Sequence, residues 1–379
     1  METSARAQRR QFVQAYASGA WSMTELCERH GISRPTGYKW VTRWQAAGDA
    51  GLDEQARTAA HCPHRMPATV AAHLVAARRT YGWGASKLLA LLRRRYPTLA
   101  WPTRSTVNAL LDREGLLHKQ RRRRGTTHPG AAPLQTTAPN QVWPIDFKGQ
   151  FKTRDGAWCF PLTVTDHFSR ALLLCEALAS TRTTEVQPAL RRLFEAVGVP
   201  DAIRTDNGVP FASTGLHGLT PLNRWWMQLG IVHQRIRPGR PQANGTHERM
   251  HRELKREACV PAAATRAAQQ ARFAAFQQRY NEERPHAALA DQTPATRWTP
   301  SPRAYPPQVT PPDYPAHFVM RRIRSGGTLK YRGRIVFVSE ALEGDHVGLD
   351  AVGDGLWDLV YYRTVLGRFD ERTGRITPG

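Results

Sequence analysis

Apolar residues recur every three or four positions through the first third of the chain, a spacing that indicates amphipathic helices. Residues 6–48 predict three helices, and a tight turn at Gly31 joins the second to the third. Ser33 is placed to cap the third helix, and Pro35 suits its first turn. The side chains expected to be buried in the first and third helices are Phe12, Val13, Tyr16, Tyr38, Val41 and Trp44.

Two helices joined by a short turn that contains glycine are typical of a helix-turn-helix, whose second helix lies in a DNA major groove. The outer face of the third helix carries Thr36, Lys39 and Arg43, which we therefore expect to contact DNA. The alternative is a plain helical hairpin with a solvated basic face, but the turn and the cap both stand where the DNA-binding motif needs them.

A second helical unit follows, with helices predicted over 68–79, 86–95 and 104–114 and a glycine, Gly115, after the last. Arg104 begins the third of these helices and is a further candidate DNA contact. The unit ends in a basic run suited to lying along phosphates, which positions DNA without reading its sequence. The candidate contacts in that run are Lys119, Arg121, Arg122, Arg123 and Arg124.

From residue 141 the pattern changes to short apolar runs that alternate later with helical stretches. Hairpins followed by alternating strands and helices predict a mixed sheet covered by helices on both faces. The predicted strands are 142–147, 158–165, 171–175, 202–205 and 231–235. The predicted helices are 184–197, 223–229, 245–259 and 265–280. Pro161 is awkward inside the second strand, because proline cannot donate a hydrogen bond to a strand ladder.

Eight prolines between residues 294 and 315 indicate an extended linker, and the chain after it reads as five short strands, as in a small β-barrel. The fold class is therefore multidomain, with helical, mixed α/β and all-β parts. The expected domains are a helix-turn-helix over 1–55, a second one with a basic tail over 66–124, an α/β core over 140–290 and a barrel over 317–379, with linkers at 125–139 and 291–316.

The net charge of +23 is concentrated toward the N-terminus, because residues 1–139 carry 22 Lys and Arg against 8 Asp and Glu, a net of +14. A concentrated basic excess favours a polyanionic partner, most commonly nucleic acid. No apolar run reaches the ~18 residues of a membrane span. Five scattered cysteines without a CxxC pair indicate a reducing compartment, and we expect a cytoplasmic, nucleoid-associated protein. His61-Cys62-Pro63-His64 lacks a second ligand pair at zinc-finger spacing and reads as linker.

Three carboxylates stand at positions that can meet in the α/β core. Asp146 lies in the first strand, Asp206 follows the strand 202–205, and Glu248 lies near the start of a helix. Carboxylates gathered in one cleft repel each other unless a cation intervenes. Such a site suits Mg²⁺ or Mn²⁺, and two such ions can serve an in-line displacement at phosphorus. On the helix of Glu248, the period places His251, Arg252 and Lys255 on the same outward face, where the two cations suit a phosphate backbone.

The stretches "WPIDFKG", "LTVTDHFSRALLL", "RTDNGVPFAS" and "PGRPQANGTHERMHRELK", in that order, resemble the integrase-type catalytic core of bacterial insertion-sequence transposases. The helical units before them, "YNEERPHAALADQTPATRW" and the terminal β segment resemble the rest of such a protein. The resemblance implies a ribonuclease-H-like fold with an Asp-Asp-Glu site, in which Asp146, Asp206 and Glu248 bind metal and Lys255 contacts DNA near the active site.

The function that the resemblance implies is that of a DNA transposase, a polynucleotidyl transferase and nuclease that cleaves 3′ ends and transfers the strand with two Mg²⁺ or Mn²⁺ ions. Its partners would be double-stranded DNA, at both element ends and target, and further copies of itself in at least a dimer on DNA, with no membrane. Two alternatives stay open: a non-catalytic DNA-binding regulator derived from a transposase, and a metal nuclease acting on RNA–DNA hybrids. Asp166 is expected to cap a hairpin turn rather than serve as a fourth acid.

Overall fold

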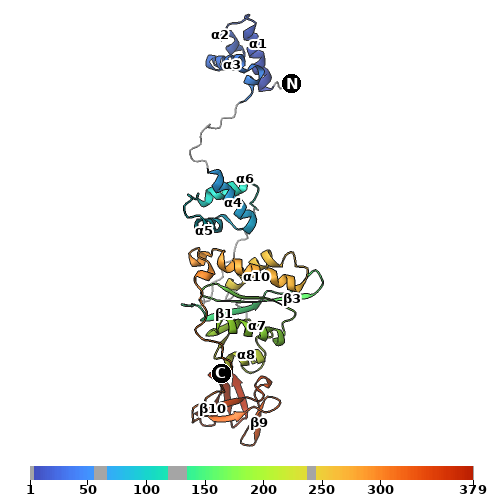
Figure 1. The fold of residues 1–379 in the computed structure, drawn as a ribbon, viewed down its shortest axis with the longest axis vertical. Coiled ribbons are helices and arrows are strands. Elements are labelled where there is room, and N and C mark those ends of the chain that lie inside the picture. The colour runs from blue at the N-terminus through green and yellow to red at the C-terminus, as the bar shows by residue number, and fades with distance from the viewer. Residues whose placement is uncertain (1–3, 55–65, 118–134, 237–244, 379) are drawn as a thin grey trace. The chain divides into compact units, whose positions relative to one another are not determined.

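The computed structural model describes residues 4–54, 66–117, 135–236 and 245–378. The chain divides into two compact units, Met1–Pro67 and Ala68–Gly379 (Figure 1). The basic run 119–124 and the cluster 61–64 lie outside the described residues. No helix in the described part of the chain is long and apolar enough to cross a membrane.

The first unit is a three-helix bundle, with α1 (Ala5–Ala17), α2 (Met23–Arg29), α3 (Arg34–Ala47) and a closing 3-10 turn, η1 (Gly48–Leu52). Ser22 and Glu25 form a capping box at the start of α2, and Gly31 turns the chain toward α3 at a φ of +61°. Ser33 stands at the cap position of α3, but its hydroxyl bonds the Thr36 hydroxyl instead of a backbone N–H.

The buried face of α3 differs from the prediction by one residue. Tyr38 is 53% exposed, so the expectation that it is buried was wrong, and Trp40 is buried in its place. The helical period explains the difference, because Gly37, Trp40, Val41 and Trp44 stand at positions i, i+3, i+4 and i+7, which share one face of a helix.

The second unit begins with the predicted helices α4 (Ala68–Tyr81), α5 (Ala85–Arg95) and α6 (Arg104–Arg113). The side chain of Thr103 caps α6 by accepting from the Thr106 N–H. Gly115 follows the helix at a φ of +68°, a left-handed conformation that suits glycine.

A mixed sheet forms the centre of this unit. Its strands are β1 (Val142–Phe147), β2 (Phe151–Lys152), β3 (Trp158–Thr165), β4 (Leu172–Leu178), β5 (Ala202–Thr205) and β6 (Val232–Arg235). β4, β3 and β1 pair antiparallel, whereas β1, β5 and β6 pair parallel, and β2 pairs with the start of β3. The predicted mixed sheet is therefore confirmed.

Helices cover both faces of this sheet, as Figure 1 shows for α7 and α10. One face packs its apolar side chains against α7 (Thr183–Val197) and α8 (Pro221–Gln228). The opposite face packs against α9 (Gly245–Leu254), the π-helical turn η4 (Lys255–Cys259) and α10 (Arg266–Glu282). Further 3-10 turns are η2 (Leu216–Gly218), η5 (Ala287–Leu289), η6 (Pro294–Thr296) and η7 (Glu340–Leu342).

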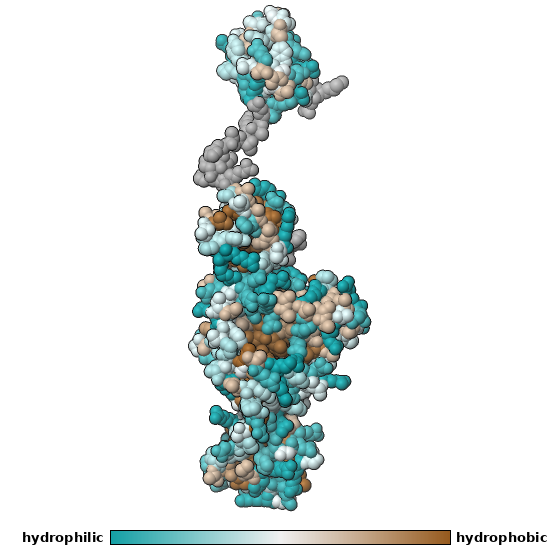
Figure 2. All heavy atoms as spheres, viewed as in Figure 1, coloured by the Kyte–Doolittle hydropathy of each residue, from teal (hydrophilic) through white to brown (hydrophobic). Residues whose placement is uncertain are grey.

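The proline-rich stretch lies against the sheet domain instead of running free. The N–H of Ser301 donates to Val197, the N–H of Val199 donates to Arg303, and the Tyr305 ring packs on Phe194 and Trp225. On the face drawn in Figure 2, hydrophilic residues predominate, with an apolar area over the sheet domain.

The C-terminal segment is all β, with β7 (Val319–Arg322), β8 (Thr328–Tyr331), β9 (Arg334–Phe337), β10 (His346–Gly353), β11 (Leu356–Tyr361), β12 (Thr364–Asp370) and β13 (Arg375–Pro378). Five strands form an antiparallel sheet in the order β13-β12-β11-β10-β7, beside a β8–β9 hairpin. Among the described residues β7 and β13 are the edges of this sheet, so the predicted small barrel is not confirmed. Arg224 of α8 makes two hydrogen bonds to Asp345 and so joins this segment to the core.

Candidate active site

The parallel pairing of β1 with β5 brings two of the predicted acids together. In this pairing, Val142, Trp143 and Pro144 of β1 lie opposite Ala202, Ile203 and Arg204 of β5. Each residue of β1 is therefore paired with the residue sixty positions later in the sequence. The same offset of sixty relates Asp146 to Asp206, which follows the end of β5, and the charge of Asp206 acts on Asp146. Paired residues of neighbouring strands point to the same face of a sheet. Both carboxylates therefore stand at the carboxyl ends of parallel strands, where ligand sites in α/β sheets lie.

The electrostatics of Asp146 agree with this placement. The pKa of Asp146 is raised to about 7, first by burial, then by the charge of Asp206 and, more weakly, by that of Glu248. The Phe147 N–H and the Lys148 ammonium act against them. A half-buried carboxyl that senses two other acids resists ionisation unless a cation is near.

Glu248 lies in the first turn of α9 and is exposed, as the sequence indicated. The helix is held on the sheet by Met250 and Leu254, which are buried among side chains of β3, β4 and α10. His251 is also buried, so the prediction that it shares the outward face of Glu248 was wrong. The helix lies close enough to the sheet that its His251 side chain meets polar groups there.

These polar groups come from β3, where Thr163 pairs directly with Asp146. The Thr163 hydroxyl donates to the Asp146 carbonyl oxygen at 2.9 Å and lies 2.7 Å from Nε2 of both His247 and His251. Because its one proton is committed, the hydroxyl accepts from both imidazole N–H groups. Nδ1 of His247 then accepts from Thr165 at 3.0 Å. Burial lowers the pKa of His247 to about 3 and that of His251 to about 2, so both rings are neutral.

Asp146, His247 and His251 each bring one possible metal-ligand atom within 4.8 Å of the others. Both nitrogens of His247 already serve the two threonines, whereas Nδ1 of His251 faces the Asp146 carboxylate at 3.9 Å. The histidines therefore act first as supports that fix α9 against β3. Asp206 and Glu248 lie outside this group and reach Asp146 through their charge.

The residues predicted to contact DNA are distributed over both compact units of the chain. Thr36, Lys39 and Arg43 lie on α3 of the first unit, where Lys39 and Arg43 approach the ring of Trp40. In the second unit, Arg104 starts α6, Arg252 lies on α9 and Lys255 opens η4, and all three are exposed. Lys119, Arg121, Arg122, Arg123 and Arg124 lie outside the described residues.

Asp166 caps the turn after β3, as predicted, by accepting from the N–H and hydroxyl of Ser169 and from the Asn140 N–H. Sequence reasoning missed His247. Its spacing of four from His251 and the alternation of Thr163 with Thr165 could have indicated that a helix face and a strand face meet there.

Family models match several parts of the chain. Two models of the integrase core domain match residues 136–241 and 229–294. A helix-turn-helix domain matches residues 8–58, and a homeodomain-like domain matches residues 36–111.

Two bacterial relatives are similar in sequence. An uncharacterized 39.2 kDa protein of insertion element IS476 from Xanthomonas euvesicatoria is 30% identical over 280 residues, which cover 71% of this chain and 75% of that protein. An uncharacterized 31.7 kDa protein of insertion element IS407 from Burkholderia multivorans is 31% identical over 175 residues, which cover 46% of this chain and 60% of that protein.

Two solved structures are similar at low identity. The simian T-cell lymphotropic virus intasome in complex with a PP2A regulatory subunit has 16% identity and a TM-score of 0.38, covering 76% of this chain and 96% of that one. The HTLV-2 integrase catalytic core domain in complex with magnesium has 17% identity and a TM-score of 0.34, covering 43% of this chain and 99% of that one.

Proposed function

Because the chain belongs to the bacterial insertion-sequence transposases with an integrase-type core, we propose that it cleaves the 3′ ends of its own insertion sequence and transfers them to target DNA. The observation that supports this proposal is the parallel register of β1 and β5, whose offset of sixty relates Asp146 to Asp206, together with the effect of the Asp206 charge on Asp146. Glu248 acts on the same carboxyl from α9.

The donor set fits a hard divalent cation. Asp146 is half-buried, and its pKa is raised to about 7 in part by the charges of Asp206 and Glu248, so a cation would stabilise the three acids. Asp146, Asp206 and Glu248 are the residues that would hold two Mg²⁺ or Mn²⁺ ions. When bound, such ions supply activation of a water or 3′-hydroxyl nucleophile and stabilisation of the leaving oxygen.

The chain's own residues position the reaction and its substrate. The threonine–histidine network fixes α9 and with it Glu248. Arg252 and Lys255, exposed on the same helix and its continuation, would bind the phosphates beside the scissile bond. The α3 helix, with Thr36, Lys39 and Arg43, would bind the element ends, and the second helical unit would add Arg104. Two ends must react together, so we propose at least a dimer on DNA.

The test is a strand-transfer assay with full-length protein, Mg²⁺ and duplexes carrying the DNA that flanks the gene. Asp206→Asn should abolish cleavage and joining but leave duplex binding unchanged, because it removes one carboxylate at the site. Asp354→Asn, at an exposed acid in a turn of the C-terminal sheet, is the matched control and should be fully active.

Each other outcome points elsewhere. Binding without any cleavage by the unsubstituted chain would favour the non-catalytic regulator. Cleavage without joining would favour a nuclease, and full activity of Asp206→Asn would remove the proposed site.

A further inference from the structure

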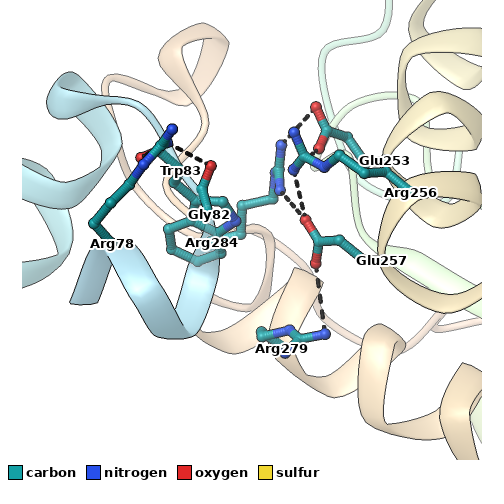
Figure 3. Close-up of polar contacts among 8 residues, drawn as sticks. All are labelled: Arg78, Gly82, Trp83, Glu253, Arg256, Glu257, Arg279 and Arg284. Carbon is teal, nitrogen blue, oxygen red and sulfur yellow. Dashed lines mark hydrogen bonds and ion pairs between the residues drawn. The ribbon is translucent and has the colours of Figure 1, made fainter. Parts of the chain in front are cut away.

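Arg284 is a buried cation that lies just beyond the end of α10. Only 4% of its side chain is exposed. Its guanidinium pairs with Glu253 at 3.0 Å and with Glu257 at 3.1 Å (Figure 3). Glu253 belongs to α9 and Glu257 to η4, its direct continuation. Since a buried charge is stable only when paired, Arg284 needs both carboxylates, and it thereby ties the end of α9 to α10.

The two glutamates also receive charges from the rim of this cluster. Arg256 contacts Glu253 at 2.5 Å and Glu257 at 2.9 Å, and Arg279 contacts Glu257 at 3.5 Å. The Arg256 side chain is 54% exposed, so solvent screens its ion pairs and they contribute little. The buried guanidinium of Arg284 is therefore the member of the cluster that fixes the geometry.

The α4–α6 helical unit covers the Arg284 guanidinium with an aromatic ring. Trp83, in the loop between α4 and α5, is 2% exposed and lies with its ring 5.4 Å from the Arg284 guanidinium carbon. Arg78 holds the loop by donating to the carbonyl oxygens of Gly82 and Trp83, both at 2.7 Å (Figure 3). On α5, Lys87 senses the same cluster, and burial together with the charge of Arg284 lowers its pKa to about 8.

Contacts farther along α5 extend the same docking surface. Arg94 donates to the carbonyl oxygens of Glu282 and Glu283, and Arg95 pairs with the Glu283 carboxylate at 3.3 Å. The helical unit therefore meets the end of α10 through several cations and one buried ring. The ring of Trp83 contacts Arg284, the residue that also holds α9, and Lys87 senses the charge of Arg284.

We propose that Arg284 is a positioning residue: covered by Trp83, it links docking of the α4–α6 unit to the placement of α9 and hence of Glu248. Glu253 follows Glu248 by five residues on the same helix, about 7.5 Å along its axis, so a displacement of one end reaches the other. The consequence for catalysis rests on the proposed function, whereas the mechanical link does not.

The test measures backbone hydrogen exchange of residues 249–258 in full-length protein, beside strand cleavage and duplex binding. Arg284→Ala should speed exchange there about tenfold or more, because the two glutamates lose their buried partner. It should lower the cleavage kcat by a similar factor while the Kd for the duplex changes little. Arg284→Lys should recover part of both losses, since a lysine keeps the charge without the two-pronged geometry.

Trp83 provides the test of the link itself. Trp83→Ala should speed exchange in 249–258 although it changes no residue of that segment. Trp83→Phe should stay closer to the parent than Trp83→Ala, because it keeps an aromatic face; it loses part of the ring system and an indole N–H that has no hydrogen-bond partner within the described residues. Arg256→Ala, which removes the exposed cation from the same glutamates, is the matched control and should leave exchange and cleavage unchanged.

Unchanged exchange in both Trp83→Ala and Arg284→Ala would overturn the proposal, as would equal effects of Trp83→Ala and Trp83→Phe. If Arg284→Ala fails to fold, the pair of Trp83 variants decides. If the chain cleaves no DNA at all, the exchange result still stands, so the link and the proposed function fail separately.

Discussion

His247 makes the stability of the sheet domain depend on pH, and the size of this effect follows from its burial. The ring is 2% exposed, and burial lowers its pKa from 6.5 to about 3. The unfolded chain therefore takes up a proton at a higher pH than the folded chain does. The stability that depends on the buried ring staying neutral is fully present above pH 6.5. It is lost as the pH falls from 6.5 toward 3, by about 1.4 kcal/mol per pH unit.

We predict that the pH dependence is reduced in His247→Gln. When the pH falls from 7.5 to 5.5, the His247 ring lowers the free energy of unfolding of the parent protein by about 1.4 kcal/mol. Glutamine does not titrate, so the variant should lose about 1.4 kcal/mol less than the parent between these pH values. The assay is pulsed hydrogen exchange of β3 peptides over a urea series at each pH, with the pulse itself at one fixed pH.

The control for this prediction is Thr165→Val, which removes the hydroxyl that faces Nδ1 but keeps the buried ring. It should lower stability at both pH values and keep the difference between them. A His247→Gln protein that loses as much stability on acidification as the parent would refute the reasoning, because the ring would then not be buried and neutral.

Three further predictions concern other parts of the chain. Gly51→Ala should destabilise the first unit by about 1–3 kcal/mol in thermal unfolding, because the added Cβ would lie 2.2 Å from the Arg43 carbonyl oxygen; an unchanged Tm would contradict that packing. Arg224→Ala should cost about 1–2 kcal/mol and expose the C-terminal sheet to proteolysis, because Asp345 loses two hydrogen bonds of 2.6 Å each; an unaltered cleavage rate would argue against that joint. Lys39→Ala should lower the slope of log K against log salt for duplex binding by about 0.9, and an unchanged slope would remove Lys39 from the phosphate contacts.

The strands of the sheet domain could be predicted from the sequence because their apolar runs end at turn residues. β1, β3 and β5 have the predicted bounds, including β3 with Pro161 inside it. The proline is tolerated for a local reason. The Pro161 carbonyl oxygen accepts from the Lys148 N–H, so the N–H that proline lacks would also face this side of β3. The residue-by-residue pairing of β3 with β1 ends at Leu162, so the missing donor lies just outside it.

Contacts between distant segments could not be predicted in this way. The helical period assigned His251 to the outward face with Glu248, but whether a histidine is buried depends on what it meets, and Thr163 lies 88 positions earlier. The cover of Arg284 by Trp83 is of the same kind, since no local pattern shows which loop will lie over a buried cation.

The alignment of β1 with β5 also determines how the site can be lost. Backbone hydrogen bonds, and not the intervening chain, align β1 with β5, so residues could be added between the two strands without moving Asp146 or Asp206 in the proposed site. A slip of one residue between the two strands would instead turn one carboxylate to the opposite face of the sheet. That change would leave every side chain intact and still abolish the proposed site.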